Sequence, residues 1–214
     1  MAGRKKLVDL TLSEFAARLA ERTPTPGGGS VAAHLAALGA ALASMAFRFT
    51  TGEKHAAVEE AMMRRAEDLD RLRERALGLV DRDSVAYDAV AVAFKLPKGT
   101  GAEKAARVQG VQEALRGALE VPLETMQTAL LALRLCAEGA PGLNPNLASD
   151  CAAGALCLGC AAEAAMLNVR INAASIQDKE YARARLAAAT GIQEEARALA
   201  ELARSALDRH LASS

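Results

Sequence analysis

The chain has 214 residues and a formal charge of zero, because 26 lysines and arginines balance 26 aspartates and glutamates. General nucleic-acid-binding proteins carry a net positive surface, so this balance argues against that class. About a quarter of the residues are alanine, and the chain has two tyrosines, four phenylalanines and no tryptophan. Since alanine has the highest helix propensity and lets helices approach closely, the composition favours an all-α fold over an all-β or Rossmann fold.

The length predicts a single domain spanning residues 1–214, with enough chain to bury a core without disulfides or metals. No run of eighteen apolar residues lacks charges, and no signal-like segment follows the basic start, so we expect a cytoplasmic protein with no membrane contact. Cys136 and Cys151 lie in an alanine-rich region where free thiols act as small hydrophobes. Cys157 and Cys160 have C-x-x-C spacing, but no second pair or nearby histidine accompanies them, which favours core thiols over a redox or metal pair.

Helical patterns follow one another along the chain, and no segment shows the alternation of a strand. Thr11 and Glu14 have capping-box spacing and predict a short helix that runs to about Glu21. Five longer helices are expected at about 30–49, 53–94, 102–137, 147–176 and 179–211. Only the second half of the 53–94 helix looks deeply buried, and Pro122 is expected to kink or split the next one. Long helices joined by short loops predict an antiparallel bundle of five to six long helices.

A glycine-rich segment precedes the apolar helix at 30–49. Gly27, Gly28, Gly29 and Ser30 expose backbone N–H groups at the positive end of that helix, an arrangement that receives anions and carbonyl oxygens. The alternative is a flexible connector, which composition alone would favour. The segment lacks the Lys-Ser/Thr ending of a P-loop, so a nucleoside triphosphate site is not expected.

Asp83 is the most conspicuous carboxylate, because its neighbours three, four and seven residues away on a helix are apolar apart from the Tyr87 hydroxyl. Burial raises the pKa of a carboxyl group toward the range useful for a general acid or base. The alternative is an aspartate bonded to a donor for structural reasons. Asp81 lies beside it on a more mixed face.

Asp150 repeats the pattern on the 147–176 helix, although an aspartate near a helix start also simply stabilises the dipole. Asn168 and Asn172 share one face further along the same helix. Asp150 and Asn168 are eighteen residues apart, which is about 27 Å along a helix, so both cannot line one small pocket in a monomer. If both are functional, a long ligand or a neighbouring subunit must join them. The three histidines are scattered, so no metal site is expected.

Four motifs in this order carry a resemblance to a known family: residues 23–33, 81–98, 144–150 and 168–172. The chain resembles the cyclodeaminase domain of the formiminotransferase-cyclodeaminases, which is shared with stand-alone methenyltetrahydrofolate cyclohydrolases. The resemblance implies an all-helical homodimer that needs no cofactor and acts on the one-carbon unit between N5 and N10 of tetrahydrofolate. Cyclodeaminases convert 5-formimino- to 5,10-methenyltetrahydrofolate with loss of ammonia, and cyclohydrolases add water to the methenyl carbon to give 10-formyltetrahydrofolate.

On that resemblance, Asp83 is the general acid/base, because both reactions pass through a tetrahedral carbon and need proton transfers. Asp150 is the candidate anchor for the pterin edge, with Asn146 and Asn144 beside it and Asn168 as a further contact. The glycine segment and Ser30 would add N–H and hydroxyl contacts, and Lys98, like Lys54, would meet the glutamate tail.

Two enzymatic activities stay open at this point. The chain has no formiminotransferase motif, so a cyclodeaminase here would be served by a separate formiminotransferase as partner. The third alternative is a non-catalytic helical scaffold or a folate-binding protein, which composition alone would favour.

Overall fold

The structure is a computed structural model that describes residues 5–212, with side chains up to Ser205, and over this range it contains helices and turns but no strand. The predicted all-α fold is therefore confirmed. The six helices are α1 (Leu12–Ala20), α2 (Gly28–Arg48), α3 (Glu59–Ala93), α4 (Gly101–Gly139), α5 (Ala148–Ser175) and α6 (Lys179–Ala212).

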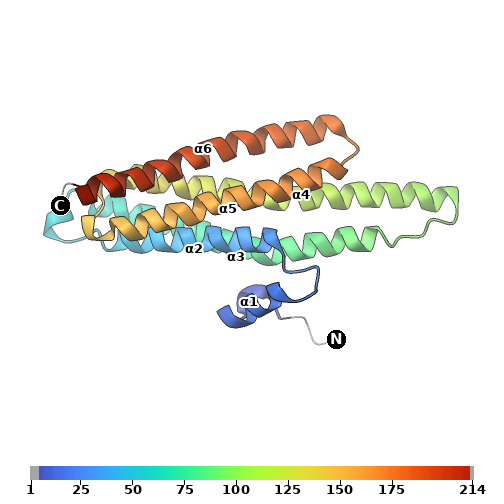
Figure 1. The fold of residues 1–214 in the computed structure, drawn as a ribbon, viewed down its shortest axis with the longest axis horizontal. Coiled ribbons are helices and arrows are strands. Elements are labelled where there is room, and N and C mark those ends of the chain that lie inside the picture. The colour runs from blue at the N-terminus through green and yellow to red at the C-terminus, as the bar shows by residue number, and fades with distance from the viewer. Residues whose placement is uncertain (1–4, 213–214) are drawn as a thin grey trace.

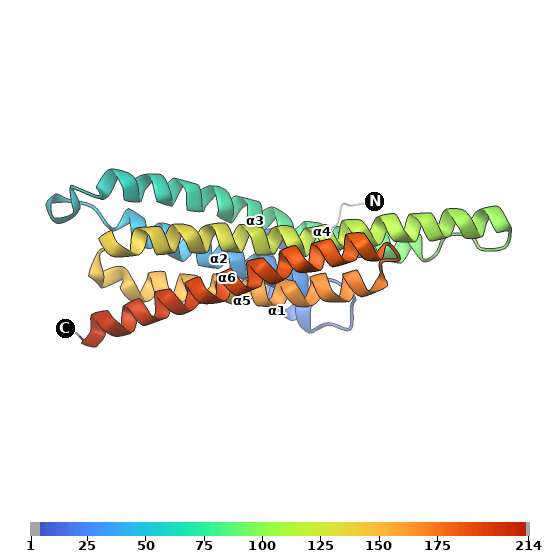
Figure 2. The same cartoon turned by 90° about the horizontal axis from the view of Figure 1, so that it is seen from above.

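The five long helices, α2 to α6, lie side by side in an elongated bundle, and the short α1 lies against one side of it (Figure 1). Helix α2 packs against α3 and α5, and α4 packs against α3, α5 and α6. Both views show that the end of α3 and the start of α4 project beyond the other helices as a two-helix hairpin (Figures 1 and 2). The hairpin extends past the N-terminus of α2 (Figure 1).

Small residues let α2 and α5 cross at close range. A Cβ on Gly39 would lie 2.7 Å from the carbonyl oxygen of Gly154, and a Cβ on Gly154 would lie 2.9 Å from the carbonyl oxygen of Gly39. Alanines such as Ala43 and Ala155 fill the core beside this crossing and are fully buried. The high alanine content therefore lets the helices pack at short range, as the small size and high helix propensity of alanine predict.

Helix α3 begins at Glu59, later than the predicted position 53. Gly52 has a φ of 88°, a left-handed conformation that glycine adopts without strain, and its N–H donates to Glu59 Oε2 at 3.0 Å. Residues 53–55 form a separate 3-10 turn after this glycine. The turn redirects the chain before the helix can start.

The expectation that only the second half of α3 is deeply buried is wrong, because both halves contain buried residues. Met62, Ala66 and Leu69 in its first half are fully buried, whereas Val85 and Val92 in its second half are 67% and 62% exposed. Leu79 and Val80 of the second half are also buried, whereas the end of α3 belongs to the projecting hairpin, where fewer helices cover it (Figure 2).

Pro122 neither splits α4 nor interrupts it, because the helix runs continuously from Gly101 to Gly139. Proline lacks an N–H, which leaves the carbonyl of Ala118 without its helical donor. The side-chain amide of Asn172 donates to that carbonyl at 2.9 Å. Asn172 therefore joins α5 to α4 and satisfies the group that Pro122 leaves free.

The cysteines do not behave alike. All four are free thiols; Cys136 and Cys151 are buried, as predicted, but Cys157 is half-buried and Cys160 is exposed. The prediction of a core thiol is wrong for Cys160, because α5 turns an apolar side to the outside of the bundle. Helix α2 and the segment Pro145–Ser175, which contains α5, are long and apolar enough to cross a membrane by length and composition alone, so the chain does contain long apolar segments that the sequence was expected to lack. Their most apolar windows are 61% and 50% buried inside the bundle, as in core helices.

Candidate functional site

Asp83 and Ser30 meet where the start of α2 faces α3. Ser30 is fully buried, and its hydroxyl donates to Asp83 Oδ2 at 2.9 Å. The hydroxyl of Ser84, also buried, lies 3.4 Å from the Ser30 hydroxyl. Sequence reasoning predicted that Asp83 faces inward and that Ser30 belongs to the site, but it missed Ser84, which has no signal beyond its place next to Asp83.

Gly29 allows this approach. A Cβ at position 29 would lie 2.6 Å from the carboxyl carbon of Asp83, which is closer than real Cβ atoms come to other atoms. The carboxylate therefore occupies the space that any other residue's side chain would fill. The glycine segment is not a passive connector, because one of its glycines is required by the packing of Asp83.

The environment of Asp83 favours its neutral form. Burial raises the pKa of this carboxyl above its ordinary value, and the hydrogen bonds from the hydroxyl and backbone N–H of Ser30 offset only part of that effect. No arginine or lysine among the described side chains forms an ion pair with it. Burial, a hydrogen-bonding serine and the lack of a paired cation are features that suit a carboxyl group to general acid–base catalysis.

The first turn of α2 is open. Gly27 is the N-cap residue, and no side chain caps the helix there. Gly28 is exposed, and a Cβ on it would lie 3.7 Å from the side-chain nitrogen of Asn168 on α5. Asn168 Nδ2 donates to the carbonyl of Ala164 at 3.0 Å, so the amide is held by its own helix and its oxygen has no partner within the described chain. The structure thus brings Gly27 to Ser30, Asp83 and Asn168 together.

Asn144, Asn146 and Asp150 lie at the opposite end of α5. Asn144 joins the loop before α5 to the end of α2, since its N–H donates to Thr50 Oγ1 at 3.1 Å and its amide donates to the carbonyl of Phe49 at 3.2 Å. Asn146 is exposed, and Asp150 is half-buried in the first turn of α5. These three residues and Asp83 do not meet within one chain.

Lys98 is exposed in the loop between α3 and α4, and Lys54 is exposed in the turn between α2 and α3, at the other end of α3. Asp81, the neighbour of Asp83, has a structural role. Its Oδ1 accepts a hydrogen bond of 2.7 Å from the backbone N–H of Leu7, which attaches the segment before α1 to α3. Asp81 therefore points away from the Ser30 contact.

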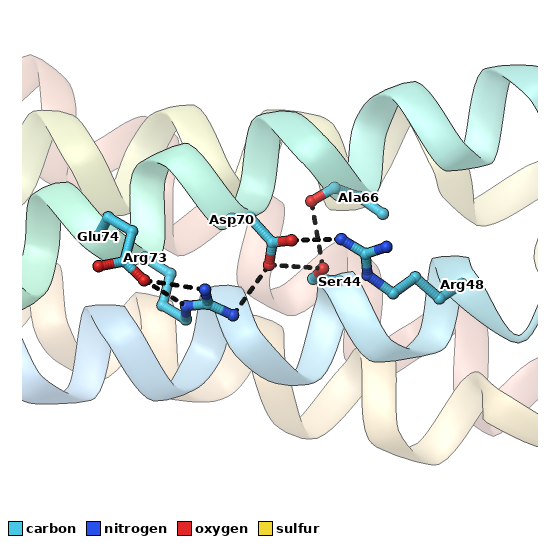
Figure 3. Close-up of polar contacts among 6 residues, drawn as sticks. All are labelled: Ser44, Arg48, Ala66, Asp70, Arg73 and Glu74. Atoms are coloured by element: carbon cyan, nitrogen blue, oxygen red, sulfur yellow. Dashed lines mark hydrogen bonds and ion pairs between the residues drawn. The ribbon is translucent and has the colours of Figure 1, made fainter.

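A second serine–aspartate pair joins α2 and α3 near their other ends (Figure 3). Ser44 donates to Asp70 Oδ1 at 3.0 Å and to the carbonyl of Ala66 at 3.1 Å. Asp70 also pairs with Arg48, and with Arg73 at 3.0 Å. Burial acts to raise the pKa of Asp70, but the bonds from Arg48 and Ser44 and the charge of Arg73 outweigh it and hold the pKa below its ordinary value.

Comparisons with known proteins agree on one family. The formiminotransferase-cyclodeaminase family model matches residues 11–190. The chain is 38% identical over 192 residues to a methenyltetrahydrofolate cyclohydrolase of Methylorubrum extorquens, covering 89% of this chain and 92% of that protein. It is 35% identical to the rat formimidoyltransferase-cyclodeaminase, covering 95% of this chain but only 38% of that longer protein.

The fold agrees as well. The crystal structure of a formiminotetrahydrofolate cyclodeaminase from Thermotoga maritima matches with a TM-score of 0.86 and 27% identity, over 96% of this chain and 100% of that one. The match spans the full helical bundle, including the helices that carry Asp83, Ser30 and Asn168. The chain belongs to the formiminotransferase-cyclodeaminase family.

Proposed function

We propose that this protein is a folate enzyme that acts on the carbon bridging N5 and N10 of tetrahydrofolate, with Asp83 as the general acid/base. The observation that carries the proposal is the Asp83 carboxyl, half-buried at the uncapped start of α2 and bonded by Ser30 without a cation. The names of the relatives support the substrate class. The burial and hydrogen bonding of Asp83 support its choice as the general acid/base.

Methenyltetrahydrofolate cyclohydrolase is the first candidate activity, because the chain covers 92% of a relative with that name. As a carboxylate, Asp83 accepts a proton from the water whose oxygen bonds to the methenyl carbon. The resulting acid returns a proton to N5 as the bond from the carbon to N5 breaks, which gives 10-formyltetrahydrofolate. The hydroxyl group on the carbon loses its proton as the formyl carbonyl forms, so the balance is one water consumed and one proton released.

Formimidoyltetrahydrofolate cyclodeaminase is the second candidate, favoured by the fold match to the Thermotoga maritima enzyme. Here N10 bonds to the formimino carbon and gives up its proton, and Asp83 transfers a proton to the departing nitrogen. The bond from the carbon to that nitrogen then breaks, so ammonia leaves and the methenyl product forms; the balance is one proton consumed. Both reactions use one proton-transferring carboxyl at the same carbon. The same site therefore fits either one, and a cyclodeaminase would receive its substrate from a separate formiminotransferase.

The homodimer is part of the proposal. Helix α5 carries an apolar stripe on the outside of the bundle, where Leu156, Leu167 and Ile171 are 45%, 64% and 70% exposed, and Leu38 of the adjacent α2 is 43% exposed. Contiguous exposed apolar surface of this kind marks protein contacts. We propose that a second copy of the chain covers this stripe. A dimer would also explain how Asp150 and Asp83, which lie far apart in one chain, can contribute to the same site.

A two-fold axis through the middle of the α5 stripe places the start of one α5 opposite the end of its partner. The Asp150 end of one protomer then lies beside the Asn168 and Asp83 end of the other. We propose that each site combines Gly27, Gly28, Gly29, Ser30, Asp83 and Asn168 of one protomer with Asn144, Asn146 and Asp150 of its partner. In this arrangement Asp150 accepts the N–H groups of the pterin edge.

The direct test follows the methenyl absorbance of the purified protein with 5,10-methenyltetrahydrofolate and, separately, with 5-formiminotetrahydrofolate. Loss of absorbance in the first assay identifies the cyclohydrolase, and a gain in the second identifies the cyclodeaminase. No change in either assay would overturn the proposal and favour the non-catalytic scaffold. We further expect no dependence on an added cofactor and a cytoplasmic location.

Subunit complementation tests the shared site. Asp83→Asn and Asp150→Asn are each expected to be inactive, and a mixture of the two, unfolded and refolded together, forms heterodimers with one intact site. Random pairing restores about a quarter of the wild-type activity, because half of the dimers are mixed and each has one good site of two. A mixture that stays inactive while forming dimers contradicts the shared site.

A further inference from the structure

Tyr87 lies one helical turn after Asp83 and makes no hydrogen bond or ring contact with another described residue. The residue is 48% exposed. The other tyrosine, Tyr181, donates to Glu120, and the guanidinium groups of Arg116 and Arg185 lie 5.1 Å and 5.2 Å from its ring centre. Tyr87 is therefore the tyrosine whose ring is available to a ligand.

The position of Tyr87 follows from the geometry of α3. Residues four apart share a face of a helix, and the rise between them is about 6 Å. Asp83 faces the start of α2 through Ser30. Helix α3 continues past the N-terminus of α2 (Figure 1), and Tyr87 follows Asp83 along α3 in that direction, toward the tip of the hairpin.

Phe94 and Arg107 lie further along the hairpin than Tyr87, nearer its tip. Phe94 lies seven residues, or two turns, after Tyr87 and is 51% exposed. Arg107 of α4 donates to the carbonyl of Phe94 at 3.2 Å and 3.3 Å, and its guanidinium carbon lies 5.7 Å from the Phe94 ring centre. No described carboxylate pairs with Arg107, since the nearby Glu103 is engaged by the N–H of Thr100 at 2.8 Å.

We infer that the folate substrate lies along α3, with its aminobenzoyl ring stacked on Tyr87 and its glutamate carboxylate held by Arg107. This inference rests on the proposed function. N10, one of the two reacting nitrogens, is bonded directly to the aminobenzoyl ring, and the glutamate follows that ring. The order of the substrate, reacting carbon then ring then carboxylate, is the order of Asp83, Tyr87 and Arg107 along the hairpin.

The chemistry of each group suits this order. An exposed tyrosine ring stacks on an aromatic ligand without losing a hydrogen bond, because its hydroxyl has no partner to give up. A guanidinium fork binds a carboxylate with two parallel bonds, and the Phe94 carbonyl orients that fork. The chain has no tryptophan and only two tyrosines, and Tyr181 is engaged by Glu120, which leaves Tyr87 as the tyrosine that can stack on the substrate.

The test uses three ligands of increasing length in anaerobic buffer: 6-methyltetrahydropterin, tetrahydropteroate and tetrahydrofolate. Dissociation constants are measured by calorimetry for wild type, Tyr87→Leu, Tyr87→Phe and Arg107→Gln. Tyr87→Leu is expected to weaken tetrahydropteroate and tetrahydrofolate by about 5-fold to 10-fold and to leave 6-methyltetrahydropterin unchanged. Tyr87→Phe keeps the ring and all three affinities, and Arg107→Gln weakens tetrahydrofolate alone by about 10-fold.

Val92→Ala is the matched control, because Val92 is 62% exposed on the opposite face of the same helix. Its affinities are expected to equal those of wild type, and circular dichroism confirms that every variant is folded. If Tyr87→Leu binds tetrahydropteroate as tightly as wild type, or if Tyr87→Phe loses as much as Tyr87→Leu, ring stacking is overturned. If wild type binds none of the three ligands, the proposed function itself fails, which is a distinguishable result.

Discussion

Two serine–aspartate pairs join α2 to α3, and they differ in one respect. Ser30 bonds Asp83 at 2.9 Å and Ser44 bonds Asp70 at 3.0 Å, so the hydrogen bonds are nearly equal. Both aspartates are half-buried. The pairs lie fourteen residues apart on α2 and thirteen apart on α3, so the same two faces meet twice.

The two aspartates differ in whether an arginine pairs with them. Asp70 is paired with Arg48 and Arg73 (Figure 3), whereas no described cation pairs with Asp83. The pKa of Asp70 is accordingly lowered, while burial raises the pKa of Asp83. The paired guanidinium groups keep Asp70 ionised in a structural role. Asp83 has no such partner, so its carboxyl can exchange a proton.

The largest expected contrast is in activity. Asp83→Asn removes the proton-transferring group and is expected to lower kcat by about 100-fold to 10,000-fold, the usual contribution of general acid–base catalysis. Asp70→Asn, the matched control, is expected to stay within about threefold of wild type, because only helix packing changes there. Both are measured with the methenyl absorbance assay on folded protein. Full activity in Asp83→Asn would show that the two pairs do not differ in function.

The next contrast concerns the space that the carboxylate occupies. Gly29→Ala puts a Cβ 2.6 Å from the Asp83 carboxyl carbon, so the carboxylate must move, and kcat is expected to fall by about 10-fold to 100-fold. Gly78→Ala is the control, since a Cβ at Gly78 meets nothing within 4 Å. That control is expected to keep its activity and to gain up to about 1 kcal/mol of stability from helix propensity. Equal activities in the two variants would contradict the tight packing at Gly29.

Stability is expected to change in opposite directions in the two aspartate variants. The lowered pKa of Asp70 means that its contribution to stability is present above the unfolded-state pKa and is lost as pH falls through the folded pKa. The raised pKa of Asp83 means that its contribution is full below the unfolded-state pKa and is lost as pH rises through the folded pKa. At neutral pH, Asp70→Asn should therefore lower the free energy of unfolding by about 1 kcal/mol.

Asp83→Asn should instead raise the free energy of unfolding at neutral pH by about 0.5 kcal/mol, because it removes an ionised group from a site that disfavours charge. Urea titrations at pH 7 measure both changes. A destabilised Asp83→Asn would mean that the carboxylate is held for structural reasons, which is the alternative considered for this residue from the sequence.

Helix content was predictable because it depends on local signals. The capping box of Thr11 and Glu14 forms as expected, with the Glu14 N–H donating to Thr11 Oγ1 at 3.2 Å. Burial was less predictable, because it depends on which helix projects past its neighbours. Val85 and Val92 are apolar in sequence and exposed in the structure, since no local pattern reports the length of α2 relative to α3.

Those site residues were predictable whose polarity or size differs from that of their sequence neighbours. Asp83 stands out among apolar neighbours in the sequence, and glycines before an apolar helix indicate close backbone approach. The contact of Gly29 with the Asp83 carboxylate joins segments more than fifty residues apart, which sequence spacing does not encode. For the same reason, Asn172 looked like a partner of Asn168 and proved to bond the carbonyl that Pro122 leaves free.

The smallest expected effect is a shift in the pH profile. Hydrogen bonds from the hydroxyl and backbone N–H of Ser30 lower the pKa of Asp83 against the effect of burial. Ser30→Ala removes the hydroxyl but keeps the N–H, so the Asp83 pKa rises further. The limb of the kcat/KM profile that reports Asp83 should therefore move to higher pH.

The equivalent change at the other pair, Ser44→Ala, raises the pKa of a carboxyl that takes no part in the reaction. Its kcat/KM profile should therefore keep the wild-type limb, although the protein becomes less stable in acid as the hold on Asp70 weakens. If the limb of the kcat/KM profile moves in Ser44→Ala and stays in place in Ser30→Ala, the group that titrates is Asp70. The site would then lie at the opposite end of α2, because the same hydrogen bond is present at both positions and only its effect on catalysis tells them apart.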